Sequence, residues 1–339
     1  MRKMATIRRI NAIDPIPNAD AIEVATVDGW KVVIKKGDFK IGDRAVYCEI
    51  DCWIPTKLAP FLSKGKEPRE YMGVKGERLR TVKLRGQLSQ GLLLNLDDAL
   101  PFTNSFQDGD DVSEVLNIGK WEMQIPAQLA GQVKGNFPTI IPKTDQERIQ
   151  NLIENINVAV QLGSKFEVTE KLEGSSMTVY LKDGEFGVCS RNLDLKETEG
   201  NAFWITARKD RIEEKLRAKG LDNVAIQGEL VGPGIQGNIY KLNYPEFRVF
   251  DVYDIENGAY IDPEYRRKLI NDLDLLHVPV LLVDKDLGVG SIDEILQWAD
   301  GLSVMGDING PQREGLVFKQ INGGMTFKAV SNKYLLGEK

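Results

Sequence analysis

The sequence predicts two domains, an all-β barrel in the N-terminal third and a largely antiparallel α+β domain after it. The chain of 339 residues is longer than one hydrophobic core normally serves. Apolar and polar residues alternate over short spans before about residue 100, and strand patterns alternate with helix patterns after residue 165. The later strands are joined by hairpin-length links, which favour antiparallel pairing over a doubly wound parallel sheet.

Residues 1–105 consist of short strand patterns separated by turn signals. AIEVATVDGWKVVIK and RAVYCEIDCWI alternate apolar and polar residues, with DG and KGD between strands. RTVKLRGQLSQGLLLNL, residues 80–96, adds one or two strands around a glycine. Roughly five short strands within about 100 residues indicate a small barrel, for which the OB fold is one candidate. We therefore expect an OB-like domain over 1–105.

Residues 106–145 are rich in Pro, Gly and Asn and are predicted to be a connector with short helices. A helix should follow in TDQERIQNLIENI, because Thr144 can cap it and Glu147 lies three residues later. The rest, residues 146–339, is expected to form the α+β domain. Three helices are predicted there, over 201–220, 262–276 and 291–302. The second starts at Asp262 with Pro263 at its first helical position, and the third starts with a Ser291/Glu294 capping box. Seven strand patterns are also present: KFEVTEKL, SMTVYLK, EFGVCSR, VAIQGELV, FRVFDVYDI, GLVFKQI and MTFKAV.

Composition excludes several classes of site. The only histidine, His277, argues against a Ser-His-Asp triad and restricts any metal to a hard cation with oxygen ligands. The three cysteines form no CxxC pair, and we expect them to be buried spectators. The chain contains no P-loop and no G-x-G-x-x-G after a strand. It also contains no long apolar run and no signal-peptide core, so we expect a cytoplasmic protein.

The charge distribution leaves a nucleic-acid partner open. The net charge of −6 argues weakly against one, yet residues 64–86 carry eight Lys and Arg against three Glu. Such a stretch, with Tyr71 in it, suits a surface that binds a phosphate backbone. On charge alone, a solvated hairpin is an equally good interpretation.

The segment EKLEGSS places Lys171 between Glu170 and Glu173. A scattered charge on a surface strand is one interpretation, and a nucleophile is the other. A free lysine is only about 0.04% neutral at pH 7, so a reactive amine costs roughly 4.6 kcal/mol. The two glutamates favour the ammonium form further. A nucleophilic Lys171 therefore requires a bound cation such as Mg²⁺ or Mn²⁺ to neutralise the carboxylates.

Further carboxylates and amines occur in similar strand settings. Glu229 in IQGELVG and Glu314 in REGLVFK each have a glycine beside them, and with Glu173 they can face one groove. Taken alone, each is more simply explained as a solvated charge at a strand end. Lys319 and Lys328 stand among apolar residues, and a buried amine needs an anionic partner such as a phosphate.

Six motifs in this order resemble those of the covalent nucleotidyltransferases, the superfamily of ATP-dependent RNA and DNA ligases and mRNA capping enzymes. They are K-L-E-G (171–174), S-R (190–191), G-E-L (228–230), F-R-V-F-D-V (247–252), E-G-L-V-F-K (314–319) and F-K-A (327–329). Residues 137–152 resemble the segment that precedes the nucleophile in RNA ligases. Few residues follow Lys328, whereas DNA ligases and capping enzymes place an OB domain after the last motif. The domain order is similar to the RNA ligase branch with an N-terminal OB domain, sometimes called the fifth RNA ligase family.

The resemblance implies an α+β nucleotidyltransferase (ligase) domain and an ATP-dependent RNA ligase. The motif lysine attacks the ATP α-phosphorus to form lysyl-AMP, AMP passes to an RNA 5′-phosphate, and a 3′-hydroxyl displaces it. The implied roles concern catalysis, metal binding and nucleotide binding. Lys171 is the nucleophile, and metal-bound waters or ribose hydroxyls are held by Glu173, Glu229 and Glu314. Arg191 reaches the ribose or the 5′-phosphate, and Phe250, in preference to Phe247, stacks on adenine. The phosphates are faced by Lys319 and Lys328, and the adenosine pocket is flanked by Glu170 and Arg148.

The sequence departs from the superfamily pattern at two positions. Glu173 stands where K-x-D-G motifs have aspartate, and Val330 stands where the last motif often has a second lysine. The lysine that contacts the α-phosphate is therefore left open among Lys328, Lys319 and Lys333.

The resemblance also implies partners. We expect ATP with Mg²⁺ or Mn²⁺, and RNA with 3′-hydroxyl and 5′-phosphate ends, including those of a nicked duplex, in RNA repair. We expect a monomer without membrane or protein partners. In the N-terminal domain, four basic residues are expected to bind the nucleic-acid backbone: Arg78, Arg80, Lys83 and Arg85. A DNA ligase, a capping guanylyltransferase and a non-catalytic nucleic-acid-binding protein are the alternatives.

Overall fold

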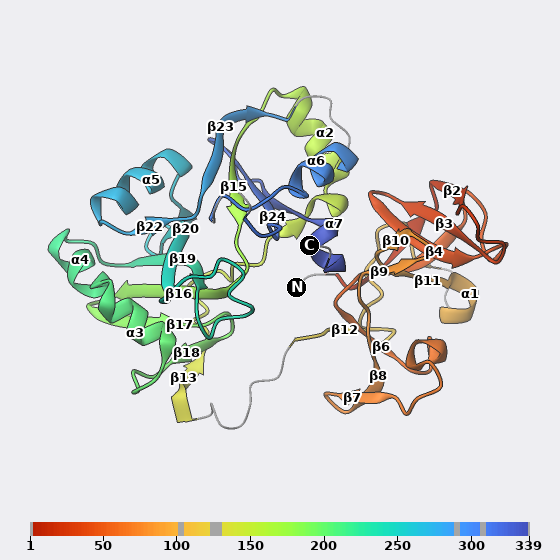
Figure 1. Cartoon of the computed structure of the whole chain (residues 1–339), viewed down its shortest axis with the longest axis horizontal. Helices are drawn as coiled ribbons and strands as arrows, with labels where there is room; N and C mark the ends of the chain where they lie inside the picture. The colour runs from red at the N-terminus through yellow and green to blue at the C-terminus, as the bar shows by residue number, and fades with distance from the viewer. Residues whose placement is uncertain (1–2, 101–104, 123–130, 288–291, 306–309, 338–339) are drawn as a thin grey trace. The chain divides into compact units, whose positions relative to one another are not determined.

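The computed structural model describes residues 3–100, 105–122, 131–287, 292–305 and 310–337. The chain divides into two compact units, Met1–Gln124 and Ile125–Lys339 (Figure 1). The first unit extends beyond residue 105, because Val112, Leu116 and Ile118 are buried in one of its cores. The segment 106–145 is thus shared between the two units, and the domain boundaries at 105 and 145 stay predictions.

The described residues of the first unit form four small sheets. One has the order β1 (Ala5–Arg9), β5 (Arg44–Cys48) and β11 (Leu92–Asn95), and a second joins β2 (Ala12–Pro15), β3 (Ile22–Val27) and β4 (Trp30–Lys35). A hairpin pairs β9 (Val82–Leu84) with β10 (Gln87–Ser89). The fourth sheet has the order β12 (Gly119–Lys120), β6 (Cys52–Pro55), β8 (Val74–Arg78) and β7 (Arg69–Tyr71). Two short helices, η1 (Pro60–Ser63) and α1 (Leu96–Ala99), complete the unit.

Two apolar clusters stabilise the first unit. Alternate residues of β4 and β5 enter them, since successive strand residues point to opposite faces. Cys48 and Cys52 lie in one cluster, Cys189 is buried in the second unit, and all three are free thiols, as predicted. Burial raises the pKa of Cys48 to about 12, so it is unreactive at neutral pH.

The second unit contains two larger sheets, which are antiparallel apart from two short pairings (Figure 1). The first runs in the order β13 (Val133–Asn136), β18 (Leu193–Leu195), β17 (Glu185–Cys189), β16 (Ser175–Lys182), β19 (Val224–Val231), β20 (Glu246–Asp254) and β21 (Ala259–Tyr260), with β22 (Leu276–His277) parallel to β20. The second runs β14 (Glu147–Arg148), β25 (Thr326–Val330), β24 (Gly315–Gln320), β15 (Lys165–Lys171) and β23 (Val280–Asp286). This arrangement confirms the predicted antiparallel α+β class.

Helices cover one face of each sheet. Residues of α3 (Ala202–Lys209), α4 (Ile212–Ala218) and α5 (Pro263–Asp272) join the core of the β16–β19–β20 sheet. Residues of α2 (Ile153–Gln161) and α6 (Ile292–Ala299) join the core of the β15–β24–β25 sheet. A short helix, α7 (Asn332–Leu336), follows β25.

Three helix predictions were wrong in detail. The helix expected from Thr144 begins only at Ile153, because Glu147 and Arg148 pair as a strand with β25. The single helix expected over 201–220 is two helices, because Arg211 adopts a left-handed conformation with φ of 54°. In the helix expected over 262–276, Asp262 caps the first turn as predicted, but α5 ends at Asp272. The predicted cap of the last helix, Ser291, lies outside the described residues.

Candidate active site

Lys171 is the last residue of β15, at the point where the chain passes from one sheet to the other. Phe166 and Val168 of this strand are buried in the helix-covered core, so the alternating residues, including Lys171, point to the opposite face. There the Lys171 Nζ lies 2.6 Å from the Glu314 Oε1, and both side chains are about one-fifth exposed, 23% and 18%. Sheet pairing produces this contact, because Lys171 is the register partner of Gly315, the residue after Glu314.

Gly174 lets the chain enter the second sheet. A Cβ atom at this position would lie 2.4 Å from the Leu230 carbonyl oxygen and 2.7 Å from the Glu229 Cγ. Only glycine therefore allows β19 to approach so closely, and β16 then pairs Ser176 with Glu229. A neighbouring strand therefore fills the space beside Gly174.

The three predicted glutamates share one electrostatic environment. Burial raises the pKa of Glu229 to about 8, Lys171 acts in the opposite direction, and Glu314 raises it further. Glu173 accepts a hydrogen bond from the Gly237 amide at 3.1 Å. The pKa of Tyr334 is raised mainly by burial, and to a smaller extent by the negative charges of Glu314, Glu173 and Glu229. The Tyr334 phenol thus interacts electrostatically with all three carboxylates, which come from three separate segments.

Among the described residues, no group of three acidic, histidine or cysteine side chains is close enough to enclose a metal ion. Protein sites for Mg²⁺ often use only one or two carboxylates, with water and substrate phosphates as the other ligands, and these three glutamates could supply such carboxylates. They do not form an all-protein cage.

Phe250 and Phe247 differ sharply in environment. Phe247 is 1% exposed in the helix-covered core. The register between β19 and β20 shifts so that Gln227 opposes Asp251 and Gly228 opposes Val249. This bulge leaves Phe250 without a register partner on β19. Val249 and Val252 join the core, whereas half-buried Phe250 packs with a separate cluster that includes Leu172. Phe250 thus stays the predicted residue for adenine stacking.

Lys319 is held in a buried charge network beside Phe250. Its Nζ lies 2.5 Å from the Asp251 Oδ1, donates a hydrogen bond to the Phe250 carbonyl oxygen and lies 5.5 Å from the Phe250 ring centroid. Burial lowers the pKa of Lys319 to about 8 despite the opposing attraction of Asp251. To touch a phosphate, this ammonium group would have to leave contacts it already makes.

The network continues through Arg266 of α5. Its Nη1 lies 3.5 Å from the Asp251 Oδ1, and it forms an ion pair with fully buried Glu167 of β15, which also pairs with Arg267. These contacts connect both sheets to α5. Sequence reasoning missed them; the available signal was a glutamate between the two apolar residues Phe166 and Val168.

Glu170 is 1% exposed, and its carboxylate holds a loop. It accepts hydrogen bonds from the Ser303 hydroxyl and, at 2.9 Å, from the Val304 amide. Burial raises the pKa of Glu170, and these two donors oppose that effect. Met305, next in this loop, packs with the cluster around Leu172 and Phe250.

The remaining nucleotide-site candidates come from three strands or their ends. Arg148 is buried on β14 and is the register partner of Lys328 on β25. Arg191 follows β17, is 47% exposed, and pairs with Asp145 at 2.6 Å. The charges of Arg191 and Lys328 both lower the pKa of Glu229, which places them in the same environment. Asp145 was not predicted as a site residue.

The four basic residues of the first unit differ in exposure. Arg80, Lys83 and Arg85 are exposed, and Lys83 belongs to the β9–β10 hairpin. Arg78 is partly buried and pairs with Asp51.

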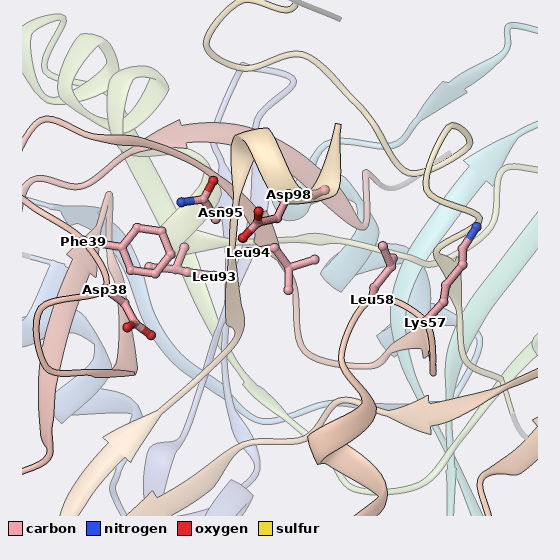
Figure 2. A pocket seen from close by; sticks show the side chains of 9 residues that line it. Asp38, Phe39, Lys57, Leu58, Leu93, Leu94, Asn95 and Asp98 are labelled. Carbon is pink, nitrogen blue, oxygen red and sulfur yellow. The ribbon is translucent and has the colours of Figure 1, made fainter. Parts of the chain in front are cut away.

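The first unit also contains a pocket of about 410 Å³ (Figure 2). Its lining comes from the loop at Asp38 and Phe39, from Lys57 and Leu58 after β6, and from β11 and α1. None of the predicted site residues lines it.

Comparisons with known proteins give consistent matches. The family model for RNA ligase matches residues 164–334, and an OB-fold domain model matches residues 4–96. No curated protein matches. Among the described residues, no helix combines the length and apolar character needed to cross a membrane.

Several similar solved structures are of Naegleria gruberi RNA ligase. The structure with PPi is 48% identical, covers 99% of this chain and 98% of that one, and has a TM-score of 0.89. A lysine-to-methionine mutant with AMP and Mn is 48% identical over 100% of both chains, with a TM-score of 0.90. A glutamate-to-alanine mutant with ATP and Mn is 49% identical over 98% of both chains, with a TM-score of 0.89.

Proposed function

This chain belongs to the RNA ligase family, and from that premise we propose how its own residues carry out ATP-dependent RNA ligation. The protein is an ATP-dependent RNA ligase that uses ATP with Mn²⁺. One observation carries the assignment of residues. The Lys171 ammonium group, the Glu314 carboxylate and the half-buried Glu229 meet where the chain crosses between the sheets.

In the first step, the Lys171 Nζ attacks the α-phosphorus of ATP, a phosphorus–nitrogen bond forms, and pyrophosphate leaves. The ion pair with Glu314 holds Lys171 as an ammonium ion, which has no lone pair for attack. Attack therefore requires Lys171 to separate from Glu314 and to lose a proton. A bound Mn²⁺ or Mg²⁺ supplies positive charge that competes with Lys171 for the carboxylate and neutralises the phosphates. Glu173, Glu229 and Glu314 are the residues that would hold it, directly or through water.

The adenosine is held on the Phe250 side of the site. Phe250 stacks on the adenine, and Lys319 and Asp251 keep the bulge that presents this ring. Glu170 sets the loop with Val304 and Met305 at the edge of the same apolar cluster. Arg148 flanks the adenosine.

The phosphates and the RNA ends approach from the side of Arg191 and Lys328. We assign Lys328 to the α-phosphate, because its charge acts on Glu229 in the same environment as Lys171, whereas Lys319 is paired with Asp251. Arg191 contacts the ribose or the incoming 5′-phosphate after separating from Asp145. AMP then moves to the RNA 5′-phosphate, and a 3′-hydroxyl displaces it to form the phosphodiester. Ends held in a nicked duplex, as in RNA repair, fit this sequence of steps.

The test is formation of a covalent adduct. The full chain is incubated with α-labelled ATP or GTP and Mn²⁺ or Mg²⁺, denatured, and examined for bound label. We expect label from ATP in the wild type and in Lys182→Met, a matched control on β16, and none in Lys171→Met. Label from GTP instead would indicate a capping enzyme. Absence of label with either nucleotide would favour a non-catalytic RNA-binding protein.

A further inference from the structure

A row of aromatic rings crosses the fourth sheet of the first unit. Trp53 lies on β6, Tyr71 on β7, and Trp121 directly after β12; the ring centroids are 5.4 Å and 6.5 Å apart along the row. Arg78 of β8 lies over the Trp121 ring, 4.0 Å from its centroid. The row begins in the core at Trp53, which is 4% exposed, and reaches solvent at half-buried Trp121 and Arg78. We call the last two residues the Arg78–Trp121 platform.

Hydrogen bonds fix the platform and the ring beside it. The Tyr71 hydroxyl accepts a hydrogen bond from the Glu122 amide at 3.1 Å, and the Trp121 amide donates to the Asp51 carbonyl at 2.8 Å. The Arg78 guanidinium donates twice to the Asp51 carboxylate, at 3.1 Å and 2.5 Å. Because these groups are ordered before any ligand arrives, binding to them loses little conformational entropy.

The same contacts give Arg78 a different environment from that of its basic neighbours. Asp51 balances the charge of Arg78, whereas its planar guanidinium stacks on an indole. Arg80, Lys83 and Arg85 are exposed on the next stretch of the chain. Phosphates attract exposed cations, but flat and charge-balanced surfaces favour the faces of nucleobases.

We propose that the Arg78–Trp121 platform stacks on an unpaired base of the RNA, while Arg80, Lys83 and Arg85 contact the flanking phosphates. This proposal rests on the RNA ligase function and deepens it. It gives Arg78 a different task from the backbone contact expected from sequence. It also adds Trp121 to the residues that bind RNA.

Salt dependence distinguishes stacking from charge. The full-length protein is titrated with a fluorescent single-stranded RNA oligonucleotide at several salt concentrations. Trp121→Ala should weaken binding about 5- to 150-fold, corresponding to stacking of about 1–3 kcal/mol per base, with an unchanged salt slope. Arg85→Ala should reduce the slope by about 0.7, the value for one contact to a single strand. Trp121→Phe should restore most of the affinity.

Two further measurements separate RNA binding from catalysis and stacking from charge. Trp121→Ala must still form the covalent adduct with ATP, which shows an intact catalytic unit; a wild type without adduct would instead count against the proposed function. Arg78→Lys keeps a cation beside Asp51 but removes the planar group, so it should also weaken binding without changing the slope. Unchanged affinity in both variants, a reduced slope in Trp121→Ala, or equal losses on a blunt, fully paired duplex would overturn the proposal.

Discussion

Replacing Gly174 with alanine tests whether the close approach of β16 and β19 positions the active site. The new Cβ would lie 2.4 Å from the Leu230 carbonyl oxygen, where ordinary contact needs about 3.4 Å, so β19 must move by about 1 Å. The second clash, at 2.7 Å, is with Glu229 itself. A displacement of about 1 Å at reacting groups can lower a rate by about 100-fold. We therefore expect adenylylation by Gly174→Ala to slow by roughly that factor.

The fold should survive this substitution. Overpacking costs about 1–3 kcal/mol. At about 2–4 °C per kcal/mol, the melting temperature should fall by roughly 2–12 °C. The assay is single-turnover transfer of label from ATP to the protein, with thermal unfolding measured in parallel. Gly135→Ala on β13 is the matched control, because its Cβ would meet nothing within 4 Å. A Gly174→Ala protein that adenylylates at the wild-type rate would refute the reasoning.

Four further substitutions test nucleotide binding and stability. Phe250→Leu should raise the KM for ATP by up to about tenfold with little change in melting temperature, whereas Phe247→Ala should cost about 3–5 kcal/mol of stability because that ring is in the core; the opposite pattern would reverse the two assignments. Ser303→Ala removes a donor to the buried Glu170 carboxylate and should cost about 1–3 kcal/mol in urea unfolding, and an unchanged midpoint would contradict this. The pKa of Lys319 is about 8 in the folded protein and about 10.4 when unfolded, so the unfolded state binds more protons between these values. This group should therefore raise stability by up to about 3 kcal/mol as pH increases from 8 to 10.4, and Lys319→Met should lack that rise.

Local sequence patterns predicted seven strands of the second unit: β15, β16, β17, β19, β20, β24 and β25. The pattern VAIQGELV coincides with β19 at both ends, and KFEVTEKL differs from β15 by one residue. All but one residue of β19 and all but the two end residues of β15 are buried, so short runs rich in apolar residues mark these strands. Strand pairing brings Lys171, Glu229 and Glu314 of the ordered motifs into one environment, through β15 with β24 and β16 with β19.

Contacts between distant segments decided the structure of two regions that the local sequence pattern could not predict. Glu147 and Arg148 have a helical signature, yet the free edge of β25 captures them as a strand. No local period distinguishes Phe250 from Phe247, because the bulge that separates them depends on the register with β19.

The motifs along the chain thus determined the class of chemistry and the nucleophile of this protein. The tertiary structure decided which cation each carboxylate meets: Lys171 with Glu314, Lys319 with Asp251, and Arg78 with Asp51. The physical reason is that the position of a charged residue in the sequence does not specify which residue it will pair with. The partner is set by which strands pair and by which side chains the pairing buries together, and burial makes the choice energetically decisive.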